Sequence, residues 1–155
     1  MPDIRRLMVI AVFVAGCGGG AQASGSASGA ASSTTPAPPG EVSTKCATAL
    51  ADFTDALTEI DSRLNVGLTY PNYGERLADA RVAYDKIKFK DLDGDCINGA
   101  GKPLEDAMNE YINAYASWKV CIDKSGCDTD SIAPQLQVHW TKATGLIAGV
   151  KKLLP

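Results

Sequence analysis

The chain has 155 residues, of which 45% are apolar and 21% charged, so its length suits one domain and its composition supports one hydrophobic core. Its formal net charge of −3 argues against nucleic acid as a partner, because phosphate backbones are bound by surfaces with excess positive charge. A single histidine, His139, excludes sites built from several histidines and leaves one candidate base for serine or cysteine catalysis.

Residues 1–16 have the pattern of an export signal. Arg5 and Arg6 precede an uncharged apolar run, residues 7–15, which is too short to cross a bilayer core of about 30 Å as a helix. The run ends in a motif that resembles the lipobox of bacterial lipoproteins, Val14-Ala15-Gly16-Cys17.

The resemblance implies that Cys17 is lipidated, with palmitate as a typical acyl chain, and becomes the first residue of the mature protein. Two or more acyl chains hold a protein durably at a membrane, so the domain is expected to be anchored outside the cytoplasm. The alternative is an ordinary secretory signal with a chance cysteine. The paired arginines also raise twin-arginine export, which we disfavour because Ile4 stands where a polar residue is expected.

Residues 17–42 are expected to form a disordered linker that begins at the lipidated cysteine. Within residues 18–40, 22 of 23 are Gly, Ala, Ser, Thr or Pro, and Gln22 is the exception. Such a segment has too little bulky apolar surface to offset the entropy cost of ordering. We therefore predict a tether, with glycosylation of its hydroxyl side chains left open.

From Ser43 onward the apolar residues recur every three or four positions, which predicts amphipathic helices. No alternating pattern typical of strands has a useful length. The stripes of apolar residues span four segments, 46–64, 73–87, 104–122 and 136–154.

Cap and turn residues fall at the limits of these segments. Ser43 or Thr44 can cap the first helix, and Gly67 can end it. Pro103 and Pro134 fit the first turns of the third and fourth helices, where a missing N–H costs little.

Short connections favour antiparallel neighbours, so we predict an all-α, up-down-up-down four-helix bundle over residues 43–155. Cys46 and Cys96 would then lie at one end, and Cys121 and Cys127 about 30 Å away at the other. Because a disulfide needs Cα atoms within about 7 Å, this topology allows only Cys46–Cys96 with Cys121–Cys127. Free thiols are the alternative; a shared tetrahedral zinc is excluded because the pairs would be too far apart.

The segment after the second helix resembles the start of an EF-hand calcium loop through Asp91, Asp93 and Asp95. It departs from the pattern at the sixth position, where Cys96 replaces glycine, and at the twelfth, where Lys102 replaces glutamate. We favour a solvated turn whose aspartates bond to local N–H groups, and keep weak calcium binding as the alternative.

Aromatic side chains are concentrated in one half of the predicted bundle. Bundle interiors can host ligands, so these rings could line a cleft, although plain core packing is the interpretation that we favour. The candidate cleft residues are Tyr70, Tyr73, Tyr111, Tyr115, Trp118 and Trp140.

Lysines gather near the other end of the predicted bundle, together with acidic residues from the same segments. Lys86, Lys88 and Lys90 are the densest group. Lysines at helix C-termini are also favoured by the helix dipole. We therefore predict a solvated surface there, and not one that binds a membrane or an anionic polymer.

The sequence indicates an exported protein. Its composition, rich in Ala, Gly, Thr and Asp, resembles that of small lipoproteins of high-GC Gram-positive bacteria. Its helical part resembles no family that we recognise. No catalytic constellation or cofactor motif is present, and His139 is expected at a surface or boundary position. We expect a non-catalytic binding module, held at the membrane by its lipid, that contacts an envelope protein or a wall component. A carrier of a small molecule or ion is the alternative.

Overall fold

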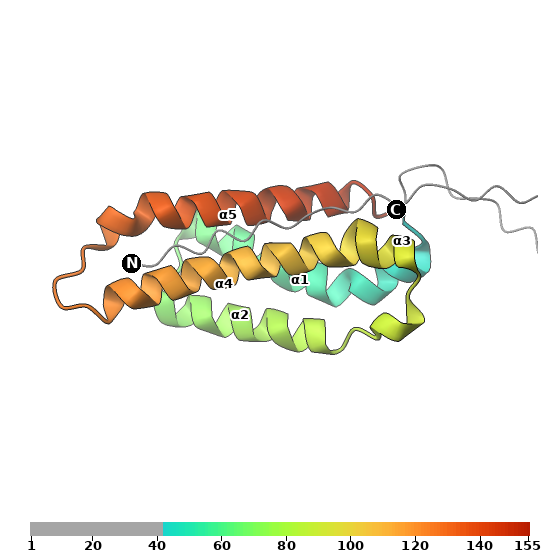
Figure 1. Ribbon diagram of the computed structural model, residues 1–155, viewed down its shortest axis with the longest axis horizontal. Coiled ribbons are helices and arrows are strands. Elements are labelled where there is room, and N and C mark those ends of the chain that lie inside the picture. The colour runs from blue at the N-terminus through green and yellow to red at the C-terminus, as the bar shows by residue number, and fades with distance from the viewer. Residues whose placement is uncertain (1–41) are drawn as a thin grey trace, which may run out of the picture. The chain divides into compact units, whose positions relative to one another are not determined.

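The computed structural model describes residues 42–155, so the predicted signal peptide, Cys17 and all of the predicted linker before residue 42 lie outside the described residues. The described part is all-helical and contains no strand, as predicted. None of its helices has the length and apolar character needed to cross a membrane. The four long helices, labelled in Figure 1, are α1 (Thr44–Val66), α2 (Tyr70–Asp85), α4 (Lys102–Ile122) and α5 (Thr129–Lys151).

Three short elements connect α2 to α4: the 3₁₀ turn η1 (Phe89–Asp91), the single turn α3 (Gly94–Cys96) and the π-helical turn η2 (Ile97–Gly101). Pro103 lies in the first turn of α4, as predicted, but further helical turns precede it from Gly94 onward. The cause is a local cap, since the Asp93 carboxylate accepts the Cys96 N–H at 2.7 Å.

The predicted apolar stripes form the core. Burial of these side chains against one another supplies the main favourable free energy of folding. The side chains with no more than 1% exposure include Leu50, Phe53, Leu57, Ile60, Tyr73, Leu104, Tyr111 and Val150.

Most predicted helix limits agree with the structure. The Ser43 hydroxyl accepts the Cys46 N–H at 3.2 Å, and Gly67 ends α1 with a φ of 97°, a conformation that favours glycine. The position of Pro134 was predicted wrongly, because it lies inside α5 and not in its first turn. Asp128 starts this helix earlier by accepting the Asp130 N–H at 3.0 Å.

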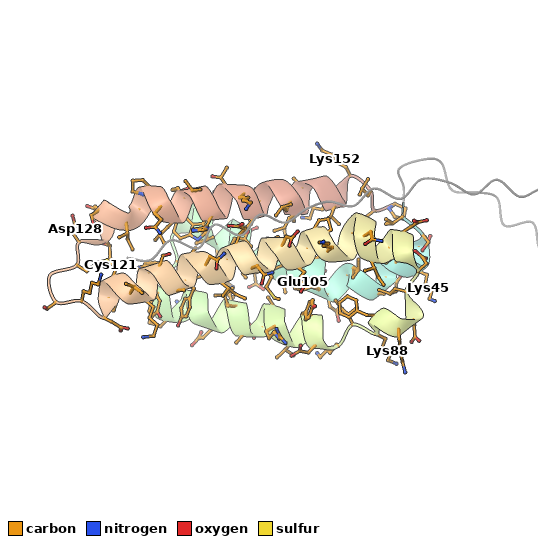
Figure 2. All side chains as sticks on the ribbon, viewed as in Figure 1. Lys45, Lys88, Glu105, Cys121, Asp128 and Lys152 are labelled. Carbon is orange, nitrogen blue, oxygen red and sulfur yellow. A yellow bond between two sulfur atoms is a disulfide. The ribbon has the colours of Figure 1, made fainter. Side chains whose placement is uncertain are left out.

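The four cysteines of the helical part form the two predicted pairs at disulfide distance. The Cα–Cα separation is 5.6 Å for Cys46 and Cys96, and 5.3 Å for Cys121 and Cys127. Figure 2 shows Lys45, which precedes the first of these cysteines, and Cys121 at opposite ends of the helical part. Each end of this part therefore has its own pair of cysteines at disulfide distance.

Candidate functional site

The predicted aromatic residues do come together, from α2, α4 and α5. Tyr70 stacks in parallel on Tyr115 with ring centroids 4.5 Å apart, and its edge also meets Trp118 at 5.7 Å. Trp118 and Trp140 are 6.3 Å apart in an edge-to-face arrangement. Contacts of this kind are typical of a packed aromatic core.

The Tyr73 hydroxyl joins three helices inside this cluster. It donates to the main-chain oxygen of Tyr111 at 2.8 Å and accepts from Trp140 Nε1 at 3.2 Å. Burial raises the pKa of Tyr73 above its usual range. The hydroxyl therefore stays protonated at physiological pH, and from α2 it acts as a donor to α4 and an acceptor from α5.

Two polar atoms in the cluster are buried without a hydrogen-bond partner in the described part of the chain, Tyr111 Oη and Trp118 Nε1. Burial, and then the nearby Asp61 carboxylate, raise the pKa of Tyr111. Thr144 also lies near this hydroxyl but does not meet hydrogen-bond geometry with it. A buried unpaired hydroxyl typically costs about 1–3 kcal/mol, so this atom calls for a functional or structural reason.

Beside the cluster, a hollow of about 450 Å³ lies between the C-terminal half of α1 and the middle of α5. Of the six predicted cleft residues, Trp140 is the one that lines it. The rings pack against one another, as the favoured interpretation has it, and the open space lies beside them at Trp140. The lining of this α1–α5 hollow comprises Asp61, Leu64, Asn65, Gln137, Trp140, Thr141, Thr144 and Gly145.

The polar groups of the α1–α5 hollow are partly organised already. The Thr144 hydroxyl donates to Asp61 Oδ1 at 2.5 Å and lies 2.9 Å from the main-chain oxygen of Trp140. Asn65 Nδ2 donates to the main-chain oxygen of Asp61 at 3.0 Å. A Cβ placed on Gly145 would meet nothing within 4 Å, so the hollow is open at this point of α5.

A charged cluster further along α4 and α5 includes the single histidine. His139 Nδ1 lies 2.6 Å from Glu110 Oε2, and Lys142 pairs with the other oxygen of the same carboxylate. These hydrogen bonds lower the pKa of Glu110, whose side chain is only 13% exposed. His139 thus occupies a boundary position, but the sequence had not indicated Glu110 as its partner.

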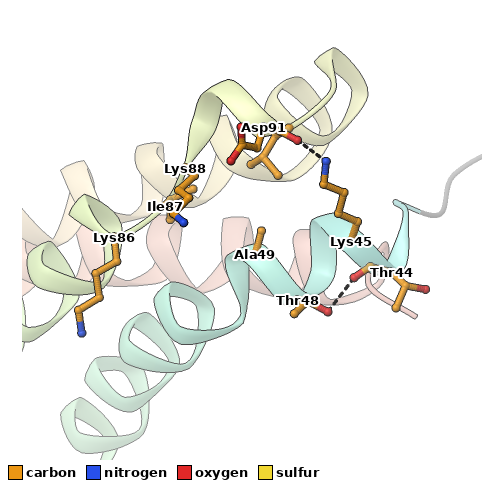
Figure 3. A pocket seen from close by; sticks show the side chains of 9 residues that line it. Thr44, Lys45, Thr48, Ala49, Lys86, Ile87, Lys88 and Asp91 are labelled. Carbon is orange, nitrogen blue, oxygen red and sulfur yellow. Dashed lines mark hydrogen bonds between the residues drawn. The ribbon is translucent and has the colours of Figure 1, made fainter.

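A second hollow, of about 500 Å³, lies at the lysine-rich end between the start of α1 and the segment after α2. Figure 3 shows Lys45 reaching across to the main-chain oxygen of Asp91, to which it donates at 2.5 Å. The side chains of Lys86 and Lys88 on its rim are exposed, as the predicted solvated surface requires. We assign it no ligand.

The three aspartates of the segment that resembles the start of a calcium loop do not share a site. Asp93 caps α3, and Asp91 offers its main-chain oxygen to Lys45. Across residues 42–155 no group of three or more His, Cys, Asp or Glu side chains is arranged to hold a metal ion. The local capping role is therefore what the structure shows for this loop.

The sequence did not indicate the pairing of Asp61 with Thr144, because the two residues are 83 positions apart and neither belongs to a motif. The only available hint was that both stand one position after a stripe residue, at the edge of an apolar face.

Comparison with protein-family models, curated proteins and solved structures gives no match for this chain.

Proposed function

We propose that this protein is an exported lipoprotein, anchored to the cell membrane through Cys17, whose helical domain is a non-catalytic binding module at the cell envelope. The observation that carries the proposal is the order of elements at the N-terminus: arginines, a short apolar run, and Val14-Ala15-Gly16-Cys17. A Gly- and Ser-rich linker after such an anchor lets a domain reach partners away from the membrane.

The distribution of cysteines supports the same proposal. Four of the five lie in two pairs at disulfide distance, which suits an oxidising compartment outside the cytoplasm. The fifth, Cys17, is the cysteine that would be lipidated at a lipobox. The odd number of cysteines is thus accounted for without a free thiol.

We also propose that the four long helices alternate in direction. The Val42 N–H donates to the Leu153 oxygen at 2.9 Å, so the entry to α1 lies beside the exit of α5, as an up-down-up-down bundle requires. In that topology both ends of the domain lie on the linker side, and the Cys121–Cys127 end is farthest from the membrane anchor.

A binding role is favoured over catalysis by the state of the polar side chains. The one histidine is held by Glu110, and the most buried tyrosine hydroxyls lie in the core. Exposed apolar side chains at Val120, Ile122 and Val138 offer contact area for an envelope protein. The carrier alternative is favoured by one observation, the hollow beside Trp140.

The anchor is tested by Cys17→Ala in the full chain, with Ser24→Ala in the linker as the matched control. We expect the wild type and the Ser24→Ala protein to carry acyl mass and to sediment with membranes, and the Cys17→Ala protein to lose both properties. Retention of the Cys17→Ala protein in washed membranes would show that the lipobox interpretation is wrong.

A further inference from the structure

We infer that the α1–α5 hollow binds an uncharged saccharide ring. This inference rests on the proposed function, and names the chemistry of one ligand that the envelope-binding module would take. The volume of the α1–α5 hollow, about 450 Å³, falls in the range of small-molecule sites. The hollow combines one aromatic wall with several polar side chains.

The aromatic wall is held in place before any ligand arrives. Because Trp140 Nε1 donates inward to Tyr73 Oη at 3.2 Å, the polar edge of the indole is turned into the core. What Trp140 contributes to the hollow is therefore apolar ring surface. Such a surface suits the C–H face of a pyranose, whose weakly positive hydrogens meet the negative face of an aromatic ring.

The polar rim offers both donors and acceptors, as neighbouring sugar hydroxyls require. Asn65 and Gln137 carry side-chain amides, and Thr141 carries a hydroxyl. Thr144 occupies only Oδ1 of Asp61, which leaves the other carboxylate oxygen for a ligand hydroxyl. The donors and acceptors come from both α1 and α5, so a ring lying between the two helices can be held from two sides.

The buried hydroxyl of Tyr111 has two residues of this rim as neighbours, Asp61 and Thr144. Burial, and then the Asp61 carboxylate, raise the pKa of Tyr111, and both neighbours line the hollow. It has no hydrogen-bond partner within residues 42–155 and is 0% exposed. A buried donor without a partner thus lies next to the polar groups that a ligand in the hollow would contact.

The charge of the lining selects against anionic ligands. The side chains that border the hollow in the described structure include no lysine or arginine, so a phosphate or carboxylate would go unpaired. Asp61 is the one carboxylate, and its charge is already shared with the Thr144 hydroxyl. A polyhydroxy ring satisfies these groups without burying a second charge.

The two open glycines of α5 give a matched pair of variants. A Cβ on Gly145 or on Gly149 would meet nothing within 4 Å, so at both positions a side chain begins in open space. Gly145 lines the hollow and Gly149, one turn further along α5, does not. Gly145→Phe should therefore fill the site, while Gly149→Phe adds the same ring elsewhere.

The test is a titration of the full-length lipoprotein, in a detergent without a sugar headgroup, with chitotriose, maltotriose and mannotriose, followed by tryptophan fluorescence. We expect at least one sugar to give a saturable change in about the millimolar range or tighter. Gly145→Phe should weaken that binding at least about tenfold and Gly149→Phe should leave it within about twofold. Asn65→Ala, on the other helix, should weaken it as well, and serves if Gly145→Phe fails to fold.

Three results would overturn the inference: no saturable change with any of the sugars, equal binding by the Gly145→Phe protein, or an equal response to tetramethylammonium chloride, which would assign the hollow to cations. Each of these results leaves the proposed function standing if the wild-type chain still captures a partner in intact cells. Loss of partner capture together with intact sugar binding would instead contradict the proposed function alone.

Discussion

Trp140 Nε1 donates to the hydroxyl of Tyr73 at 3.2 Å, and the same hydroxyl donates to the main-chain oxygen of Tyr111 at 2.8 Å. One buried side chain of α2 thereby fixes the relative positions of α4 and α5, and it also orients the indole that walls the α1–α5 hollow. The site and the stability of the fold therefore depend on the same hydroxyl.

Replacement of this hydroxyl in Tyr73→Phe should destabilise the fold by about 1–3 kcal/mol, because it leaves the Trp140 N–H and the Tyr111 oxygen buried without their partner. Equilibrium unfolding in urea, followed by far-ultraviolet circular dichroism, measures the change. Tyr84→Phe, at a half-buried position, is the control and should cost less than about 1 kcal/mol. Equal stability of the Tyr73→Phe protein and the wild type would refute the bridging role.

The two cysteine pairs should contribute unequally to stability. The pair Cys46 and Cys96 closes a separation of 50 residues, and the pair Cys121 and Cys127 closes one of 6. The entropy of loop closure then predicts that the free energy of unfolding falls by about 4 kcal/mol when the first pair is replaced by alanines, and by about 2 kcal/mol when the second pair is replaced. The measurement is the urea midpoint of each double variant. A larger loss from the short loop would contradict this account.

The ion pair between Glu110 and its partners on α5 predicts a dependence of stability on pH. The pKa of Glu110 is lowered in the folded protein, chiefly by its hydrogen bond to His139, so the ionised carboxylate is favoured by folding. Its contribution is complete above the ordinary glutamate pKa of about 4.3 and declines as the pH falls below that value. Glu110→Gln should therefore lower the free energy of unfolding by about 1 kcal/mol at neutral pH, and by progressively less as the pH falls below about 4.3.

Unfolding in urea at a series of pH values tests this sign, with Glu75→Gln on the exposed face of α2 as the control. The difference in unfolding free energy between wild type and the Glu110→Gln protein should shrink as the pH falls below about 4.3, whereas the control should show little difference throughout. A difference that grows below that pH would mean that folding does not favour the ionised carboxylate.

The helical segments could be predicted from the sequence because each buried face repeats every three or four residues, and that period belongs to one helix alone. Ser43 and Gly67 were predictable for the same local reason, since a cap and a left-handed glycine act on their own turn. Pro134 was placed wrongly although Asp128 is a local cap of the same kind, because Pro134 was taken to mark the first turn and the Asp128 cap starts α5 before it.

Contacts between helices could not be predicted in the same way. Glu110 with His139, and Asp61 with Thr144, are joined only when α4 and α1 pack against α5, and nothing in the local sequence marks them. The aromatic rings were predicted to share one region and they do, but the position of the open space depends on how the rings pack. Stacking of Tyr70 on Tyr115 fills the interior and leaves the hollow outside it.

Close packing between α2 and α4 gives a prediction at Gly74. A Cβ there would lie 2.9 Å from Tyr115 Oη and 3.2 Å from its ring carbons, and the Tyr115 ring is stacked against Tyr70. Gly74→Ala should therefore destabilise the fold by about 1–2 kcal/mol. Gly145→Ala, in open space, should instead stabilise it by about 0.5–1 kcal/mol. Thermal unfolding of both proteins measures the contrast, and stabilisation of both would show that Tyr115 can move aside.

Cross-linking in intact cells, followed by affinity capture of the full chain and mass spectrometry, tests most directly whether this protein is a lipid-anchored binding module. We predict that an envelope protein or a wall fragment is attached to the wild-type chain, and that the attachment is strongly reduced in the Cys17→Ala variant, which is not held at the membrane. Capture of nothing beyond the chain itself, or of the same molecules in equal amount by the Cys17→Ala variant, would contradict the proposal.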